Sequence, residues 1–221
     1  MKFSKNLKQA LAGTTLALAA VGAASAATLV QQQITPSDQA PWGTNLTFNK
    51  FDTSLGTLTG VQIDFKGFGS GAAQVTHGTG GGSLSMDELG STTQITAPGL
   101  IAITKNDFVG TQVFLWAAGS PSPTNFDTGI FSQSTLNVID SAFWGDYSGV
   151  GTFDIAVLVN ELISWDPTKV TGDFGAATFK TYGGADVKLT YSYRSVPEPG
   201  SLALLALGGL ALGFARRQRK A

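Results

Sequence analysis

The middle of the chain alternates apolar and polar residues with a period of two. In 61–66, valine, isoleucine and phenylalanine alternate with glutamine, aspartate and lysine. The same alternation continues over eight residues in 187–194 and recurs in 153–160. A period of two places the apolar side chains on one face of an extended strand. These segments therefore predict half-buried antiparallel strands.

Shorter segments of similar character predict further strands at 28–34, 45–51, 72–76, 92–96, 100–104, 111–117 and 130–138. Turn residues separate them, and we expect the glycine run 78–83 to be a flexible loop. Only 134–143 and 166–170 suggest helix or a helical turn. Some ten short strands without a long helix predict an all-β fold, an antiparallel β-sandwich of jelly-roll type.

Aromatic side chains must supply much of the cohesion of this domain, because the chain has no cysteine and so forms no disulfide. Trp116 and Trp165 border predicted strands and are expected in the core. The full set of expected core aromatics is Phe48, Phe51, Phe65, Phe114, Trp116, Phe153, Trp165, Phe179 and Tyr191.

Residues 1–26 have the three parts of a secretory signal peptide. Lysines at 2, 5 and 8 precede a short apolar run at 11–21. Ala24 and Ala26 then supply the small residues that signal peptidase requires before a cut at Ala27. The predicted mature domain, 27–195, is therefore exported across the inner membrane.

The C-terminal segment 196–221 is equally patterned. Val196, Pro197, Glu198 and Pro199 cannot continue a strand, because the two prolines lack the N–H donor. The run 201–215 is apolar or small throughout, and it predicts a short transmembrane helix of about 22 Å. The basic residues Arg216, Arg217, Arg219 and Lys220 follow at once and should remain in the cytoplasm.

This tail resembles the PEP-CTERM sorting signal of Gram-negative bacteria, through the order of its motif, apolar run and basic cluster. The resemblance implies that an exosortase in the membrane cuts near the motif and passes the protein to the cell surface or to extracellular exopolysaccharide. The inner membrane is then only a temporary anchor.

Charge is distributed unevenly along the chain. The formal net charge is −1, but the basic residues gather at both ends. Between residues 27 and 195, seven basic residues stand against fourteen acidic ones, a charge of −7. An acidic domain repels phosphate, so nucleic acid is excluded as a partner.

A second resemblance lies in 48–61, where the sequence FNKFDTSLGTLTGV is similar to the hallmark of the choice-of-anchor E domain. Asp52 and Ser54 are suited to cap a tight turn, and Gly56 permits a positive φ. The resemblance implies a surface location and a fold type more than a chemistry.

The chain offers little catalytic chemistry. The single histidine, His77, adjoins the glycine run without a G-x-S-x-G motif, so we expect an exposed loop histidine. Asp87 and Glu88 could pair with another carboxylate as the acid and base of a secreted glycoside hydrolase, but adjacent acids usually lie on a solvated loop. We therefore expect no enzyme and no cofactor.

Two binding alternatives remain. Asp146, with Asp140 and Asp154, lies around a glycine-rich stretch that suits calcium, although the spacing matches no known calcium loop. Trp42, Trp144 and Tyr147 lie in turn-like segments where we expect exposed rings, and exposed aromatic rings suit a sugar-binding platform. The leading expectation is a structural or adhesive surface protein of biofilm or exopolysaccharide, and the alternative is a carbohydrate- or calcium-binding module.

Overall fold

The computed structural model describes residues 26–196 and residue 208. The predicted signal helix and the C-terminal transmembrane helix lie outside these residues. Among the described residues, no helix is long and apolar enough to span a bilayer. The strands are β1 (Ala26–Ile34), β2 (Asp38–Gln39), β3 (Trp42–Asn49), β4 (Gly56–Ala97), β5 (Leu100–Val109), β6 (Gln112–Trp116), β7 (Thr124–Asp127), β8 (Phe131–Val138) and β9 (Thr152–Ser195). The helical turns are η1 (Thr53–Leu55), η2 (Ser141–Phe143) and α2 (Trp144–Tyr147).

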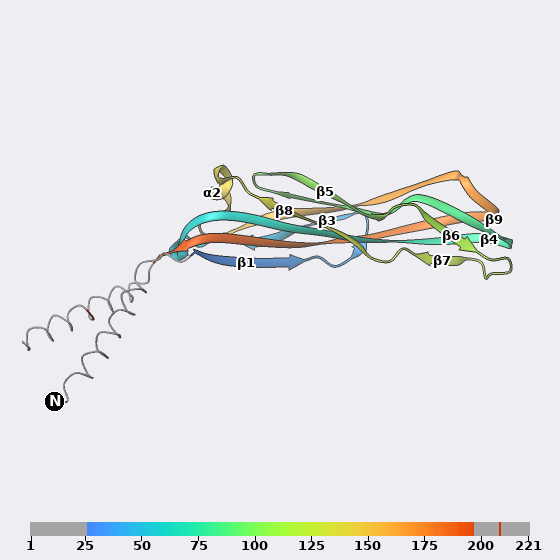
Figure 1. The fold of residues 1–221 in the computed structure, drawn as a ribbon, viewed down its shortest axis with the longest axis horizontal. Helices are drawn as coiled ribbons and strands as arrows, with labels where there is room; N and C mark the ends of the chain where they lie inside the picture. Colours follow the sequence, from blue (N-terminus) through green and yellow to red (C-terminus); the bar gives the residue numbers. More distant parts are fainter. Residues whose placement is uncertain (1–25, 197–207, 209–221) are drawn as a thin grey trace, which may run out of the picture.

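The two long strands β4 and β9 form the body of the molecule. Each runs away from the end where β1 begins, turns over at the far end and comes back (Figure 1). They pair antiparallel almost throughout, from Gly56 opposite Ser195 to Thr96 opposite Ala156. We call the end with β1 and Ser195 the base, and the end where both strands turn over the tip.

Glycines make the turn at the tip possible. The pairing register shifts between Thr76 and Gly82, and Gly172 has a φ of 76°. A Cβ on Gly172 would lie 2.0 Å from the carbonyl oxygen of Gly81, so only glycine fits where the two backbones cross. The expectation of a flexible loop at 78–83 is wrong, because these residues belong to β4.

The returning strands build two layers. In the first, β1 pairs with the arm 174–195 of β9, which pairs with the arm 56–77 of β4, which pairs with β8. In the second, β3, the arm 152–172 of β9, the arm 82–97 of β4, and β5 follow in the same way. Strand β2 extends the edge of β1, β7 that of β8, and β6 that of β5.

Every one of these strand pairs is antiparallel, which confirms the expected all-β class. We number the arms and strands from one to eight along the chain and count the short β2, β6 and β7 with the strands whose edges they extend. One layer then has the order 1-8-3-6 and the other has the order 2-7-4-5. This is the double Greek-key order of a jelly roll. The expectation of helix at 166–170 is wrong, because these residues lie in β9, and the expectation at 134–143 holds only for the turn η2, because 134–138 lies in β8. Within residues 26–196, helix is confined to the short turns η1, η2 and α2.

Two apolar clusters fill the space between the layers. The base cluster centres on Phe48, Phe51, Phe65, Tyr147 and Tyr191, together with aliphatic residues of β3, β4 and β9. The tip cluster comprises Ala73, Val75, Leu84, Met86, Leu89, Phe114 and Trp116, with Trp165 and Phe179 packed against it. The expected core aromatics are thus confirmed as buried or packed on the core.

A polar waist separates the two clusters. Ser91, Thr93, Asp107 and Thr181 are buried there. Glycines face these side chains. A Cβ on Gly67 would lie 2.3 Å from Asp107 Oδ2, and a Cβ on Gly69 or Gly183 would lie 2.3 or 2.5 Å from Ser91 Oγ. The layers therefore meet here through glycine backbone and small polar side chains.

Glutamines join the edge strands β1 and β3, which belong to different layers. Gln31 Nε2 donates to the carbonyl of Asn49 at 2.9 Å, and Asn49 N–H donates back to Gln31 Oε1 at 2.9 Å. Gln33 donates to the carbonyl of Thr47. These bonds satisfy the free edge of β3, which would otherwise be open to another strand.

Candidate functional site

The predicted sorting motif begins where the sheet ends. β9 ends at Ser195, opposite Gly56, and Val196 N–H donates to the carbonyl of Leu55 at 3.3 Å. Pro197, Glu198 and Pro199, as well as the basic residues 216–220, lie outside the described residues. The motif is therefore joined to the folded domain without an intervening linker.

The predicted signal-peptidase site lies at the same end (Figure 1). Ala26 is opposite Arg194 and Ala27 is opposite Tyr193, so β1 and the end of β9 are neighbours. Ala24 lies outside the described residues. A cut before Ala27 removes one residue from β1 and leaves its remaining pairs with β9 in place.

The turn 52–56, which carries the choice-of-anchor resemblance, supports this junction. Asp52 Oδ1 accepts the N–H of Ser54 at 2.8 Å, and this hydrogen bond lowers the pKa of Asp52. Gly56 follows with a φ of 151°, and a Cβ there would lie 1.9 Å from the carbonyl oxygen of Arg194. The capping role predicted for the turn is thus observed.

The predicted sugar-binding residues are embedded in the base of the domain. Tyr147 is fully buried, its hydroxyl donates to the carbonyl of Pro98 at 2.5 Å, and burial raises its pKa. Trp144 packs on the base cluster and its Nε1–H donates to the carbonyl of Ile139 at 3.1 Å. The expected exposure of Tyr147 is therefore wrong.

The predicted calcium carboxylates make separate local contacts. Asp140 caps η2 by accepting the N–H of Ala142 at 2.9 Å, and Asp154 accepts the hydroxyl of Thr47 at 2.6 Å. Asp146 lies in the single turn of α2. Within residues 26–196, no group of three or more His, Asp or Glu side chains is placed to hold a metal ion.

His77 is buried in the tip, contrary to the expected exposed loop. Its Nδ1 lies 2.8 Å from the carbonyl of Gly78 and its Nε2 lies 2.9 Å from Thr124 Oγ1. The ring stacks on Trp116 with centroids 5.3 Å apart. The imidazole therefore contacts a carbonyl, a hydroxyl and an indole, which suits packing rather than proton transfer oriented by a carboxylate.

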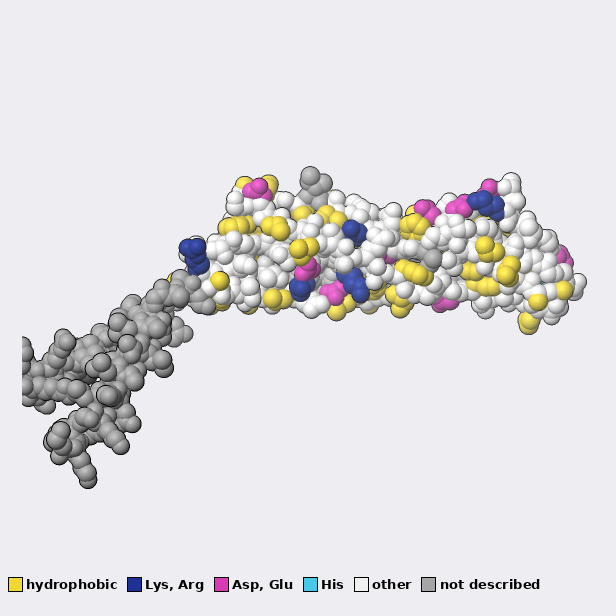
Figure 2. Space-filling view, viewed as in Figure 1, with side chains coloured by type: hydrophobic (Ala, Val, Ile, Leu, Met, Phe, Trp, Pro, Cys, Tyr) yellow, Lys and Arg dark blue, Asp and Glu magenta, His cyan; other side chains and the backbone are white. Residues whose placement is uncertain are grey.

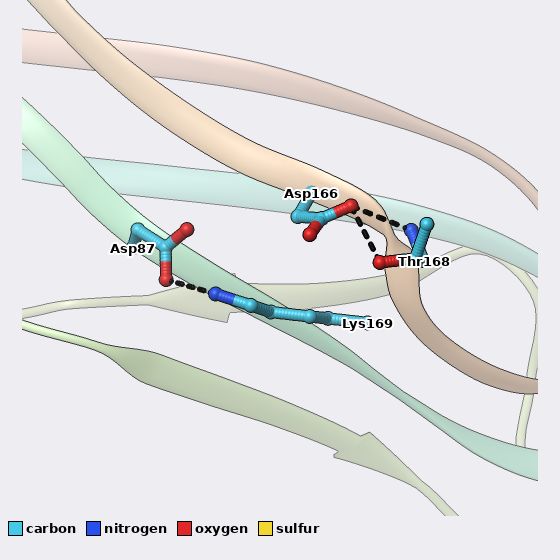
Figure 3. Close-up of polar contacts among 4 residues, drawn as sticks. All are labelled: Asp87, Asp166, Thr168 and Lys169. Atoms are coloured by element: carbon cyan, nitrogen blue, oxygen red, sulfur yellow. Dashed lines mark hydrogen bonds and ion pairs between the residues drawn. The ribbon is translucent and has the colours of Figure 1, made fainter.

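The first acid of the pair 87–88 is held in an ion pair near the tip. Asp87 Oδ1 accepts Lys169 Nζ at 2.7 Å, as Figure 3 shows. On the same side, Asp166 Oδ1 accepts both the N–H and the hydroxyl of Thr168, at 2.8 and 2.7 Å, which lowers the pKa of Asp166. These contacts fix an exposed bend of β9.

Asp107 is the group that sequence reasoning missed. Its carboxyl is fully buried in the waist, and burial raises its pKa to about 6, against the opposing effects of Thr93, Gln133 and Lys105. Within the described part of the chain, neither of its carboxyl oxygens has a hydrogen-bond partner of ordinary geometry. Extending the alternation of 100–104 to residue 107 places Asp107 on the inward face, so a signal was present.

The outer face of the first layer is hollowed in two places. One hollow, of about 410 Å³, is lined mainly by polar and charged residues of β1, β4, β8 and β9, and the other, of about 380 Å³, lies nearer the tip. Figure 2 shows acidic and basic side chains interspersed rather than gathered by sign. Alternation in 61–66 and 187–194 already indicated this polar face.

A family model of the PEP-CTERM protein-sorting motif matches residues 195–220. The chain thus carries a sorting motif directly after its last strand, as the sequence predicts. The motif supports an exported surface protein with a membrane-anchored precursor that an exosortase processes. The resemblance to the choice-of-anchor E domain stays a prediction.

A comparison with curated proteins finds no match. Among solved structures, a chain of infectious bursal disease virus strain Gx is 10% identical, with 79% of this chain and 38% of that chain covered and a TM-score of 0.17. A chain of the T13 particle of the same virus is 11% identical, with 76% and 36% covered and a TM-score of 0.20. This chain thus spans less than two fifths of those proteins.

Proposed function

We propose that this protein is released from its membrane tail by an exosortase, and that its β domain then has a structural or adhesive role in the exopolysaccharide around the cell. The observation that carries the proposal is the PEP-CTERM motif, which begins where β9 ends. The β domain is the part that remains after the signal peptide and the C-terminal sorting segment have been removed.

The position of the motif supports processing close to the membrane. The apolar run begins at residue 201, and the five residues between it and the end of β9 reach about 17 Å when extended. Before cleavage, the base therefore lies against the membrane surface. The tip, at the opposite end of the elongated body, points away from it (Figure 1).

The contacts of the acidic residues and of the histidine support a non-catalytic role. The carboxylates of Asp87, Asp140 and Asp154 each have their own structural partner. His77 is held inside the tip cluster. The burial of Tyr147 removes one member of the sugar platform, so the carbohydrate- and calcium-binding alternatives have less support than the structural role.

Expression with and without the exosortase tests the sorting half of the proposal. With the enzyme, the intact mass should correspond to a chain cut near residues 196–199, recovered from the surface or the medium. Without it, the precursor should keep its tail and stay in the membrane. Glu198→Ala should resemble the enzyme-deficient strain, and Glu161→Ala serves as the control. Equal masses and locations in both strains would contradict the proposal.

The matrix role has a separate test. In producing cells, the processed protein should sediment with the exopolysaccharide and be released when that polysaccharide is enzymatically digested. Retention on the cells after complete digestion would contradict a matrix location. Loss of matrix cohesion on deletion of the gene would support a structural role over a passive one.

A further inference from the structure

A block of alternating charges lies on the outer face of the first layer. Lys188 and Asp186 lie on β9, directly opposite Asp64 and Lys66 on β4. The sign therefore alternates both along each strand and across the strand pair. We call these four residues the charge block. All four line the hollow of about 410 Å³.

Lys66 is the member of the charge block for which the described part of the chain supplies no partner. Lys188 Nζ pairs with Asp64 Oδ2 at 2.7 Å, and Asp186 accepts Gln32 Nε2 at 2.8 and 3.0 Å. Within residues 26–196, no hydrogen bond or ion pair reaches the exposed ammonium of Lys66. This group is available to a carboxylate from outside the molecule.

Exposed aliphatic side chains flank the charge block on both edge strands. Val30 and Ile34 on β1 are 52% and 62% exposed, and Leu136 and Val138 on β8 are 55% and 74% exposed. The pairing registers place Val30 and Val138 in one row across the four strands. These side chains place exposed apolar area on both sides of the charge block, and contact with another protein would remove that area from water.

We propose that this face binds the same face of a second copy, related by a two-fold axis parallel to the strands. That rotation lays β9 over the partner's β4 and β1 over the partner's β8. Every member of the charge block then faces an opposite charge, and Val30 faces the partner's Val138. A two-fold contact requires such a self-complementary surface.

A two-fold axis perpendicular to the strands also matches the charges, but it fits the apolar edges less well. It would bring Gln32 over the partner's Ile34 and Val138 over the partner's Ser132, so none of the four exposed aliphatic side chains would meet another. The parallel axis also places Gln32 over the partner's Leu136 and Ile34 over the partner's Ser134, but it brings Val30 to the partner's Val138. The parallel axis is therefore preferred. It also leaves the bases of both copies at the same end, so two proteins attached to one membrane form the contact side by side.

The contact suits tethered molecules rather than dilute ones. Four strands about 4.8 Å apart, over the five residues from Val30 to Ile34, give only a few hundred Å² per copy. Stable complexes bury ~800 Å² per partner. Attachment to one surface raises the effective concentration and compensates for the small area. The contact between the two faces does not depend on the proposed sorting, but the attachment of both copies to one surface does.

The absence of cysteine from the sequence gives a direct test in the full chain. Facing sheets lie about 10 Å apart, which is too far for a disulfide but within reach of a bis-maleimide with a short spacer. Within one copy, Val30 and Val138 lie three strand spacings apart, about 14 Å, beyond the reach of that spacer. When exporting cells are treated with this reagent, the double variant Val30→Cys, Val138→Cys should give a cross-linked dimer on denaturing gels, while either single variant stays monomeric. A monomeric double variant would overturn the proposal.

Charge reversal in the same background tests the axis. Lys66→Glu places like charges opposite each other and should reduce cross-linking at least tenfold. Adding Asp186→Lys leaves the charge block with only positive charges on β9 and only negative charges on β4. The parallel axis lays β9 over the partner's β4 and so places opposite charges face to face again, whereas the perpendicular axis lays β9 over the partner's β9 and brings like charges together. Cross-linking should then recover, and failure to recover would overturn the assigned axis.

Two controls accompany this experiment: the first tests whether the contact is specific, and the second separates this proposal from the sorting proposal. Glu161→Lys, an exposed reversal in the other layer, should leave cross-linking unchanged. The experiment is repeated in cells without exosortase, where the precursor keeps its tail. The dimer should persist there, so a failure of sorting leaves the contact intact. Loss of the dimer in the control variant would overturn a specific contact.

Discussion

The base and the tip of the body differ in how their apolar side chains are enclosed. At the base, Phe51 lies between Tyr191 and Tyr193, with centroids 5.7 and 5.1 Å away, and α2 closes the end. At the tip, the short strands β6 and β7 cover the cluster, and the ring pair Phe114–Phe126 joins them at 4.9 Å. Glycines bend both long strands there.

This difference indicates an uneven distribution of stability. The base holds eight paired strand segments and the glutamine bonds between β1 and β3, whereas the tip has fewer strands across each layer and a buried Trp116 Nε1 without a hydrogen-bond partner in the described chain. Regions with fewer buried contacts open at lower free energy. We expect the tip to open while the base remains folded.

The largest expected effect comes from removing a ring at the base. Phe51→Ala should lower the free energy of unfolding by ~3–5 kcal/mol, because it leaves a cavity among buried aromatics. Leu84→Ala at the tip should cost ~2–5 kcal/mol in local stability. Hydrogen exchange should show the tip opening alone in the Leu84 variant. Equal exchange at both ends would show one cooperative unit and break the comparison.

The waist between the two ends should make stability depend on pH. Burial raises the pKa of Asp107 to about 6 from an ordinary value of 3.8, so the folded state holds this proton more tightly than the unfolded state. Its contribution to stability is therefore fully present below pH 4 and is lost as pH rises from 4 through 6, by about 3 kcal/mol.

Asp107→Asn isolates this effect. The variant should unfold at nearly the same temperature at pH 5 and pH 8, after subtraction of the pH dependence common to other groups. The natural protein should melt at a lower temperature at pH 8. A parallel pH dependence of both proteins would show that Asp107 is not buried as described.

A smaller effect tests the edges of the base. Gln31→Ala should cost about 1 kcal/mol, because it removes two hydrogen bonds to Asn49 that join β1 to β3. Gln32→Ala, the adjacent glutamine on the outer face, should change stability less, since within residues 26–196 its side chain bonds to the partly exposed Asp186 and does not join β1 to β3. Urea titrations of both variants make the comparison, and an equal loss would contradict a bridging role for Gln31.

The smallest effect is expected at the exposed bend near the tip. Lys169→Ala removes an ion pair with Asp87 whose side chains are both well exposed. Such pairs contribute little, because water and salt screen them. The melting temperature should not change measurably at 0.15 M salt. A clear loss that salt abolishes would show that this bend holds the tip together.

Local periodicity was sufficient to predict part of every strand except β2 and β7, together with part of the outer face, but it did not predict the middle of β9. The alternation in 61–66 and 187–194 reports both strand and exposed face, and the registers place these two segments side by side. The motif at 196–199 could be predicted for a different reason, because it is recognised from the order of residue types and does not depend on any tertiary contact.

The rest depends on contacts that sequence alone does not give. Glycines at 78–82 predict a loop locally, but pairing with β9 holds them in a strand. Tyr147 adjoins polar and glycine residues and is nevertheless buried, because the chain from 139 to 148 folds over the base cluster. The charge block arises only when β4 and β9 align.

The order of the strands also bears on when the domain can form. β9 is the last strand along the chain, yet it pairs with β1, β3 and β4, and Gly56 finds its partner only at Ser195. Contacts this distant in sequence form late in folding. Neither layer is complete until the residue before the sorting motif has joined the sheet. A chain that lacks its C-terminal segment therefore presents no finished domain, and folding itself distinguishes complete copies from truncated ones.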